Sequence, residues 1–333
     1  MKAFKIISLK LSFLAFSNAF INSSYFFFNV QQSKSKISMV SFSNLVEEKV
    51  ISKFGKKETE RVLDSWKRMD KGESFEKQWE GKGLQKSSSY IDGLFSEPWH
   101  DPSNKKLYPW VEKLVSESEN IAKELKQVLK VMEKMEMGDN VWSVAAREEA
   151  LAYGPDWRTL VLQDREWDPI NSELFPVTTA AIKNSGIPSC EAFFAKQAPH
   201  TGIKPHTDDT NFILTAHLGL DIPEGECRMK VGEETREWRN NQVLIFDTSF
   251  VHSTANDSDR TRTVLLLRFF HPEVTQVEKD ALNFIFKAIG DPSIVGYQSF
   301  DSSQSSVEKV STEGRTRQER RAAEREKQKA LKR

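Results

Sequence analysis

The chain has 333 residues, with 48 lysines and arginines against 48 aspartates and glutamates, so its formal net charge is zero. This length is enough for one large core or two ordinary domains, and a hydrophobic fraction of 38% is typical of a globular protein. The balanced charge argues against a broad nucleic-acid surface. The two cysteines, Cys190 and Cys227, exclude a disulfide-dense scaffold and a four-cysteine zinc module, and leave one disulfide open.

The zero net charge conceals an uneven distribution. Residues 1–44 contain five lysines and no acid, and residues 313–333 carry nine basic residues against four glutamates. The segment between them therefore has a net charge of −10. The two ends differ in kind from the middle of the chain, which is expected to hold the fold.

The first 20 residues have a lysine-bearing start and an apolar stretch that closes at small residues, which is the layout of a secretory signal peptide. The stretch contains Lys10 and is too short for a membrane-spanning helix, so no integral span is expected in the mature protein. Residues 20–44 are rich in Ser, Phe and Lys, as transit peptides are. Residues 1–44 resemble a two-part plastid presequence and predict a plastid location, with the ER and secretory pathway as the alternative.

Two helices are predicted in the next part of the chain. One covers roughly 57–69, and a long amphipathic helix runs from Trp110 to about Met135, where apolar residues recur at helical spacing. Serines and prolines between 87 and 102 indicate a loop. Residues 45–150 are therefore expected to form a helical N-terminal region that packs on the core.

After about residue 157 the sequence predicts short strands separated by turns, which indicates an all-β sandwich or barrel over 151–290. A final helix follows a capping box formed by Thr275 and Glu278. Residues 291–333 are expected to form a flexible basic tail. The predicted strands are 191–196, 212–221, 228–231, 242–247 and 261–270.

Three side chains in the β region form a candidate metal site. His206 and Asp208 stand two apart in an extended segment, so they point to one face, and His252 follows 46 residues later. Two histidines and one carboxylate make the facial triad that leaves positions open on Fe(II). Asp208 has an alternative interpretation as a turn residue beside Asp209.

Three further residues are candidates for contact with an anionic co-substrate. Arg262 lies on an apolar strand, where a guanidinium is costly unless it meets a carboxylate, and an ordinary buried salt bridge is the alternative. On the strand 212–220, alternation places Thr215 and His217 on the face assigned to the cavity. A strand histidine is more often a core residue, but the distance of eleven residues from His206 favours a co-substrate contact.

The same segment resembles the aspartyl/asparaginyl β-hydroxylases, which are Fe(II)- and 2-oxoglutarate-dependent oxygenases with a double-stranded β-helix, or jelly-roll, fold. The ordered matches are Pro-His-Thr-x-x-x-Asn at 205–211, His-Leu-Gly-Leu at 217–220, Glu-Thr-Arg-Glu-Trp at 234–238, Val-Leu-Ile-Phe-Asp at 243–247, Arg262 and His-Pro at 271–272. The resemblance implies a mainly β jelly-roll core with a helical N-terminal layer and a C-terminal helix.

Carried over by position, His206 and His252 resemble the iron-binding histidines, Arg262 the arginine that binds the distal carboxylate of 2-oxoglutarate, and His217 a second contact to it. Well-studied animal members have Gly at the place of Asp208, so this chain would restore the carboxylate ligand. They also carry Arg-x-Arg-x-His where this chain reads Ile-Leu-Thr-Ala-His at 213–217. Thr215 is left as a hydrogen-bond donor for the proximal end of 2-oxoglutarate.

The resemblance implies a dioxygenase that uses Fe(II), 2-oxoglutarate and O₂ to hydroxylate a C–H bond. The substrate would be an Asp or Asn side chain of a protein or peptide, with a lipid acyl chain or small molecule as the alternative. Competing hypotheses are a jelly-roll protein that binds a metal or carboxylate without turnover, and a zinc hydrolase. The zinc hydrolase is disfavoured because it would leave Arg262 without a role. No nucleic-acid partner is expected, and the sequence does not indicate an oligomeric state.

Overall fold

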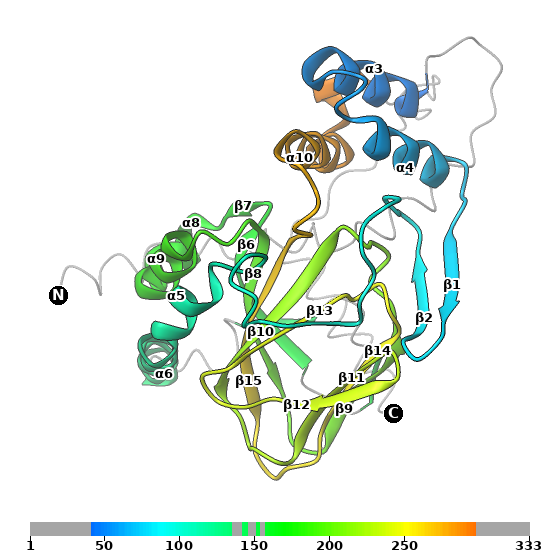
Figure 1. Cartoon of the computed structure of the whole chain (residues 1–333). Coiled ribbons are helices and arrows are strands. Elements are labelled where there is room, and N and C mark those ends of the chain that lie inside the picture. The colour runs from blue at the N-terminus through cyan, green and yellow to red at the C-terminus, as the bar shows by residue number, and fades with distance from the viewer. Residues whose placement is uncertain (1–40, 135–141, 146–150, 154–156, 298–333) are drawn as a thin grey trace, which may run out of the picture. The chain divides into compact units, whose positions relative to one another are not determined.

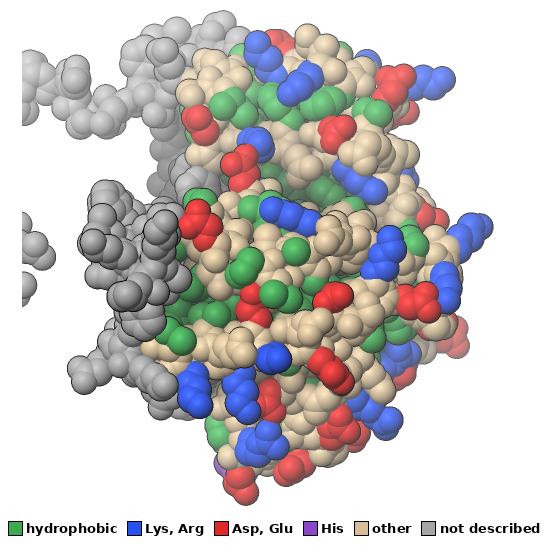
Figure 2. Space-filling model, turned by 90° about the vertical axis from the view of Figure 1, so that its left-hand side faces the viewer, with side chains coloured by type: hydrophobic (Ala, Val, Ile, Leu, Met, Phe, Trp, Pro, Cys, Tyr) green, Lys and Arg blue, Asp and Glu red, His purple; other side chains and the backbone are tan. Residues whose placement is uncertain are grey.

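A computed structural model describes residues 41–134, 142–145, 151–153 and 157–297 (Figure 1). The predicted presequence, apart from its last four residues, and nearly all of the predicted basic tail lie outside the described residues. In the described part of the chain, no helix is both long and apolar enough to span a membrane. On the face drawn in Figure 2, acidic and basic side chains are intermingled.

The core consists of two antiparallel β-sheets. The larger sheet has eight strands in the order β3-β13-β10-β15-β8-β6-β4, with β7 paired to β6, and the smaller sheet has five in the order β12-β11-β14-β9-β5. The strands of the larger sheet are β3 (Trp99–His100), β13 (Val243–Phe246), β10 (Ile213–Asp221), β15 (Arg262–Phe270), β8 (Ser189–Gln197), β6 (Trp157–Asp164), β4 (Ser143–Val144) and β7 (Glu166–Trp167). Those of the smaller sheet are β12 (Glu234–Glu237), β11 (Cys227–Val231), β14 (His252–Asn256), β9 (Thr201–His206) and β5 (Ala152–Tyr153).

Chain order and pairing together define a jelly roll. From β8 to β15 the chain alternates between the two sheets, except that β11 and β12 form a hairpin within the smaller sheet. The strands β8, β15, β10 and β13 are neighbours in one sheet, and β9, β14, β11 and β12 are neighbours in the other. Met229 and Val231 of the smaller sheet and Phe246 and Val264 of the larger sheet lie in one buried cluster with Trp238. The predicted jelly-roll core is confirmed, and all five strands predicted from the sequence are present.

Helices cover the outer face of the larger sheet. They are α5 (Val111–Ser116), α6 (Ser118–Lys134), α8 (Pro169–Leu174) and α9 (Pro176–Ser185), which Figure 1 shows together beside the strands. Leu114, Ile121 and Leu125 of the helices share a buried cluster with Leu214 and Leu218 of β10. The prediction of one unbroken helix over 110–135 is wrong, because the N–H of Glu117 bonds to the carbonyl of Leu114 at 3.1 Å and this tight turn separates α5 from α6.

A second group of helices comprises α3 (Phe42–Phe54), α4 (Glu60–Asp70), α10 (Gln276–Gly290) and the short η3 (Pro292–Val295) (Figure 1). Thr275 and Glu278 form the predicted capping box at the start of α10. A hairpin of β1 (Phe75–Trp79) and β2 (Gly83–Ser87) comes directly before the segment predicted as a loop, and the short β3 lies within that segment. The hairpin reaches the site region, because the N–H of Lys86 donates to the carbonyl of Ser249 at 2.8 Å.

Candidate metal and carboxylate site

His206 and His252 face each other across two neighbouring strands of the smaller sheet. His206 is the last residue of β9 and His252 the first of β14, and the two are direct partners in the antiparallel register. Such cross-strand partners project to the same face of a sheet. Their imidazole rings accordingly lie with centroids 4.1 Å apart.

Backbone carbonyls fix the orientation of both rings. Nδ1 of His206 lies 2.8 Å from the carbonyl oxygen of Lys204, and Nδ1 of His252 lies 3.0 Å from that of Phe250. Because a carbonyl oxygen only accepts, each Nδ1 carries the proton and each Nε2 presents a lone pair. Burial lowers the pKa of His252 to about 4, so this imidazole is neutral at pH 7. Neutral imidazoles with Nε2 free are the form that binds a metal ion.

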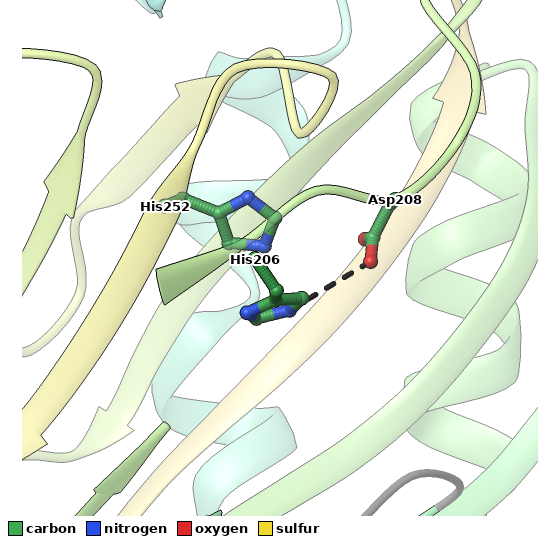
Figure 3. Close-up of side chains that lie close together, drawn as sticks. All are labelled: His206, Asp208 and His252. Atoms are coloured by element: carbon green, nitrogen blue, oxygen red, sulfur yellow. Dashed lines mark ion pairs between the residues drawn. The ribbon is translucent and has the colours of Figure 1, made fainter. Parts of the chain in front are cut away.

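Asp208 supplies a carboxylate next to the two rings (Figure 3). Its Oδ1 lies 3.8 Å from Nε2 of His206, and one ligand atom from each of the three residues lies within 4.8 Å of the other two. The loop is held in place because the N–H of Asp208 donates to the carbonyl of Thr248 at 2.9 Å. Two imidazole nitrogens and one carboxylate oxygen are the donor set of the facial triad, so these residues fit a divalent iron ion.

Arg262 lies inside the barrel at the first position of β15. Its side chain is buried, its Cζ lies 4.3 Å from the ring centroid of Trp238, and Nη2 donates to Oε1 of Gln197 at 2.6 Å. Its buried Nε has no hydrogen-bond partner, and no ion pair forms between Arg262 and an acidic residue in the described part of the chain. The alternative of an ordinary salt bridge is therefore not what the structure shows.

Burial without a counterion also affects the charge of Arg262. It lowers the pKa of the guanidinium to about 10, which still leaves the group charged at pH 7. A buried cation with an unpartnered donor favours an anion from outside the protein.

His217 and Thr215 lie on the interior face of β10, as the alternation predicted. Nδ1 of His217 accepts from Nε1–H of Trp238 at 3.2 Å, which leaves Nε2 as the protonated nitrogen. Burial first, and then Arg262 and His252, lower the pKa of His217 well below its ordinary value, so it is a neutral donor. The Oγ1 atom of Thr215 is buried without a hydrogen-bond partner among the described residues.

Arg268 is a polar residue of the interior that sequence reasoning missed. It follows Arg262 by six positions on β15, and its partners in the register are Thr215 of β10 and Glu191 of β8. Its Nη1 lies 3.4 Å from Oε2 of Glu191, while its Nε is buried without a partner. The even spacing from Arg262 was the available signal, because alternate residues of a strand share one face.

The remaining histidines lie apart from this site. His100 falls in the segment 87–102 that was predicted as a loop, but it is buried on the short strand β3 with its Nδ1 2.5 Å from the hydroxyl oxygen of Tyr108. His271 is buried beside it with ring centroids 6.0 Å apart, and His200 forms a surface contact to Asp259 at 2.8 Å. Cys190 and Cys227 are both buried and both free, which settles the open question of a disulfide.

Parts of the chain are similar to known proteins. Residues 115–272 match the sequence model of a family described as Aspartyl/Asparaginyl beta-hydroxylase. A human aspartyl/asparaginyl beta-hydroxylase is 29% identical over 215 residues, which is 60% of this chain and 26% of the human protein. Residues 115–272 are thus similar to the aspartyl/asparaginyl β-hydroxylase family. The chain spans about a quarter of the length of the curated relatives that it matches.

Other relatives are similar over shorter stretches. A rat aspartate beta-hydroxylase domain-containing protein 2 is 38% identical over 92 residues, which is 27% of this chain and 26% of the rat protein. Among solved structures, an oxidoreductase of the 2OG-Fe(II) oxygenase family from Burkholderia pseudomallei has a TM-score of 0.28 and 12% identity, covering 37% of this chain and 71% of its own. The jelly roll described above is established by the strand order and not by this slight likeness.

Proposed function

We propose that this chain is an Fe(II)- and 2-oxoglutarate-dependent dioxygenase that hydroxylates a C–H bond. The observation that carries the proposal is the buried guanidinium of Arg262, which has an unpartnered Nε. It lies in the same barrel interior as His217, which interacts electrostatically with Arg262 and with the candidate ligands His252 and Asp208. A site that combines a metal-binding triad with a separate buried cation suits a ligand with an anionic group at each end. The names of the human and rat relatives support hydroxylation as the reaction.

The proposed binding mode assigns a role to each side chain. His206, Asp208 and His252 would hold the iron, and Arg262 would bind the distal carboxylate of 2-oxoglutarate through a charge-assisted hydrogen bond. His217 would add a neutral Nε2–H donor without adding charge. One carboxylate ligand on a divalent ion leaves a single positive charge, which together with Arg262 balances the two negative charges of 2-oxoglutarate.

Iron, when bound, supplies the oxidative chemistry, in which O₂ and 2-oxoglutarate yield succinate and CO₂ while one oxygen atom is inserted into the substrate C–H bond. The protein's part is to hold the reactants and to exclude water. The buried cluster around Trp238, Phe246 and Val264 closes the interior between the sheets. An aspartyl or asparaginyl side chain of a protein or peptide is the proposed substrate, on the strength of the family.

Succinate release tests this proposal. We expect the purified protein, loaded anaerobically with Fe(II) and then given O₂, to convert 2-oxoglutarate to succinate. Arg262→Gln should weaken binding of 2-oxoglutarate by roughly 10- to 100-fold, because a hydrogen bond to a charged group is lost. Arg260→Gln is the matched control, since Arg260 is exposed and paired with Asp221 at 2.7 Å.

Two results would separate this proposal from its rivals. Tight Fe(II) binding with neither 2-oxoglutarate binding nor succinate release would indicate a non-catalytic metal-binding jelly roll. Succinate release that is stimulated by a fatty-acyl or small-molecule compound, but not by aspartyl or asparaginyl peptides, would replace the proposed substrate class while keeping the chemistry.

The role of Asp208 has its own test. We expect Asp208→Gly to retain the fold and to weaken Fe(II) binding, because the charged member of the donor set is removed while both histidines keep their carbonyl contacts. Direct titration with Fe(II) under anaerobic conditions measures the change. Unchanged iron affinity in Asp208→Gly would instead support the interpretation of Asp208 as a turn residue.

A further inference from the structure

The interior face of β15 carries two arginines, one toward each end. Arg262, Val264, Leu266 and Arg268 alternate along the strand, and Val264 and Leu266 lie in or against the cluster between the two sheets. Six residues of extended chain separate the Cα atoms of the two arginines by about 20 Å. The function proposed above uses Arg262, whereas Arg268 has no assigned role.

The surroundings of Arg268 contain two donors without acceptors. Arg268 stands directly opposite Thr215 in the pairing of β15 with β10. Both Nε of Arg268 and Oγ1 of Thr215 are buried without a hydrogen-bond partner among the described residues, and Thr215 is only 3% exposed. Buried polar atoms normally have partners, so two adjacent exceptions indicate a missing acceptor.

The charge of Arg268 is already compensated inside the protein. Glu191 accepts from Arg268 and also from Arg165, whose Nη1 lies 2.9 Å from Oδ1 of Asp164. Two cations and two anions thus form one cluster with no net charge. This position therefore offers hydrogen-bond donors rather than excess positive charge.

The cluster lies close to the candidate metal ligands. Burial alone would lower the pKa of Arg268, but Glu191 first and then Asp208 raise it above its ordinary value. Thr215 stands two residues from His217 on the same face of β10, a distance of about 7 Å along the strand. The position thus adjoins both the proposed ligand Asp208 and the proposed co-substrate contact His217.

We propose that Thr215 and Arg268 together bind the carboxylate at the 2-oxo end of 2-oxoglutarate, which rests on the function proposed above. A carboxylate bound next to a metal ion has its charge matched by that ion, so it needs donors that orient it more than it needs another cation. Oγ1–H of Thr215 and Nε–H of Arg268 supply two such donors from neighbouring strands. Arg262 would hold the opposite end of the same molecule.

Calorimetric titration of the Mn(II)-loaded protein tests this assignment without turnover. We expect Arg268→Gln to weaken binding of 2-oxoglutarate by roughly 10- to 100-fold and Thr215→Val by about 2- to 10-fold, as expected for charged and neutral hydrogen bonds. Both losses should persist with 2-oxobutyrate, which has the 2-oxo acid end but no distal carboxylate. Arg262→Gln should weaken 2-oxoglutarate binding and leave 2-oxobutyrate binding unchanged.

Arg268→Lys separates binding from folding. A lysine keeps a positive charge for Glu191 but has no Nε–H donor at the same place, so we expect a wild-type melting temperature together with weakened binding of both acids. Arg260→Gln serves as the neutral control. If Arg268→Gln binds 2-oxoglutarate with wild-type affinity, the assignment is overturned. This holds even if Arg268→Gln binds an aspartyl peptide more weakly, because Arg268 would then contact the substrate and not 2-oxoglutarate. If the unmodified Mn(II) protein binds neither acid, the function proposed above fails and this assignment fails with it.

Discussion

The two sheets of the jelly roll differ in how they are buried and in what they contribute to the site. Every residue of β10 except Asp221 is buried, because helices cover the outer face of the larger sheet and the smaller sheet covers its inner face. In β11 of the smaller sheet, buried residues alternate with the exposed Arg228 and Lys230. A sheet buried on both faces gives continuous apolar runs, and a half-exposed sheet gives alternation.

The residues of the candidate site are also divided between the two sheets. The two histidines of the metal site stand at the ends of β9 and β14 in the smaller sheet, whereas Arg262, His217 and Thr215 belong to the larger sheet. The two histidine ligands are therefore at strand ends, where the carbonyls of Lys204 and Phe250 can fix their rings. The groups proposed to bind the organic acid lie on the most deeply packed strands, which suits a ligand that must be held away from water.

The largest expected difference between the sheets concerns metal binding. His252→Ala should abolish measurable Fe(II) or Mn(II) binding, because it removes one of three protein ligands, and His206→Ala should do the same. His217→Ala, on the larger sheet, should leave metal affinity close to that of the wild type. Metal content after dialysis measures both effects. Stoichiometric iron in His252→Ala would contradict the assignment of the metal-binding histidines to the smaller sheet.

The second difference concerns stability. Leu267 is fully buried between the larger sheet and its helices, so Leu267→Ala should reduce the free energy of unfolding by about 2–5 kcal/mol through lost burial and a cavity. Lys230→Ala on the exposed face of the smaller sheet should change it by about 0.5 kcal/mol or less. Chemical denaturation compares the two variants. Equal losses would show that the sheets do not differ in packing as described.

A third difference concerns acid. Burial lowers the pKa of His100 to about 3 and that of His271 to about 4, both at one end of the larger sheet. The unfolded chain, with ordinary histidines of pKa about 6.5, binds protons that the folded chain excludes, so acidification favours unfolding. We expect the metal-free protein to lose about 1 kcal/mol per histidine for each pH unit between about 6.5 and 4.

The matched control for this acid effect is His200→Gln, because His200 lies at the surface, and it should retain the wild-type slope. The measurement is denaturation of the metal-free protein at a series of pH values. A free energy of unfolding that is independent of pH between 6.5 and 4 would mean that His100 and His271 are not held neutral in the fold.

Alternation and turn residues were enough to predict β8, β10 and β15, the three longest strands of the larger sheet, but not β6. The face assignment of Thr215 and His217 followed from the same alternation and is confirmed by the contact of His217 with Trp238. The strands β9 and β14 were missed as strands, because their short, partly polar sequences carry little periodic signal. Their cross-strand pairing, which brings His206 opposite His252, depends on tertiary structure.

Two local features also lay beyond sequence reasoning. The amphipathic spacing of 110–135 continues through Glu117, so the break between α5 and α6 is set by backbone hydrogen bonding and not by the apolar pattern. Arg268 was passed over because one charged residue on an apolar strand does not reveal which groups oppose it. Its position opposite Thr215 and Glu191 comes from the register of three strands.

A crystal structure with Mn(II) and N-oxalylglycine bound tests the central claim most directly. The account predicts one ion held by Nε2 of His206, Nε2 of His252 and a carboxylate oxygen of Asp208, with the distal carboxylate of the inhibitor on Arg262. An ion bound elsewhere, or an inhibitor whose distal carboxylate does not reach Arg262, would contradict the division of the site between the two sheets.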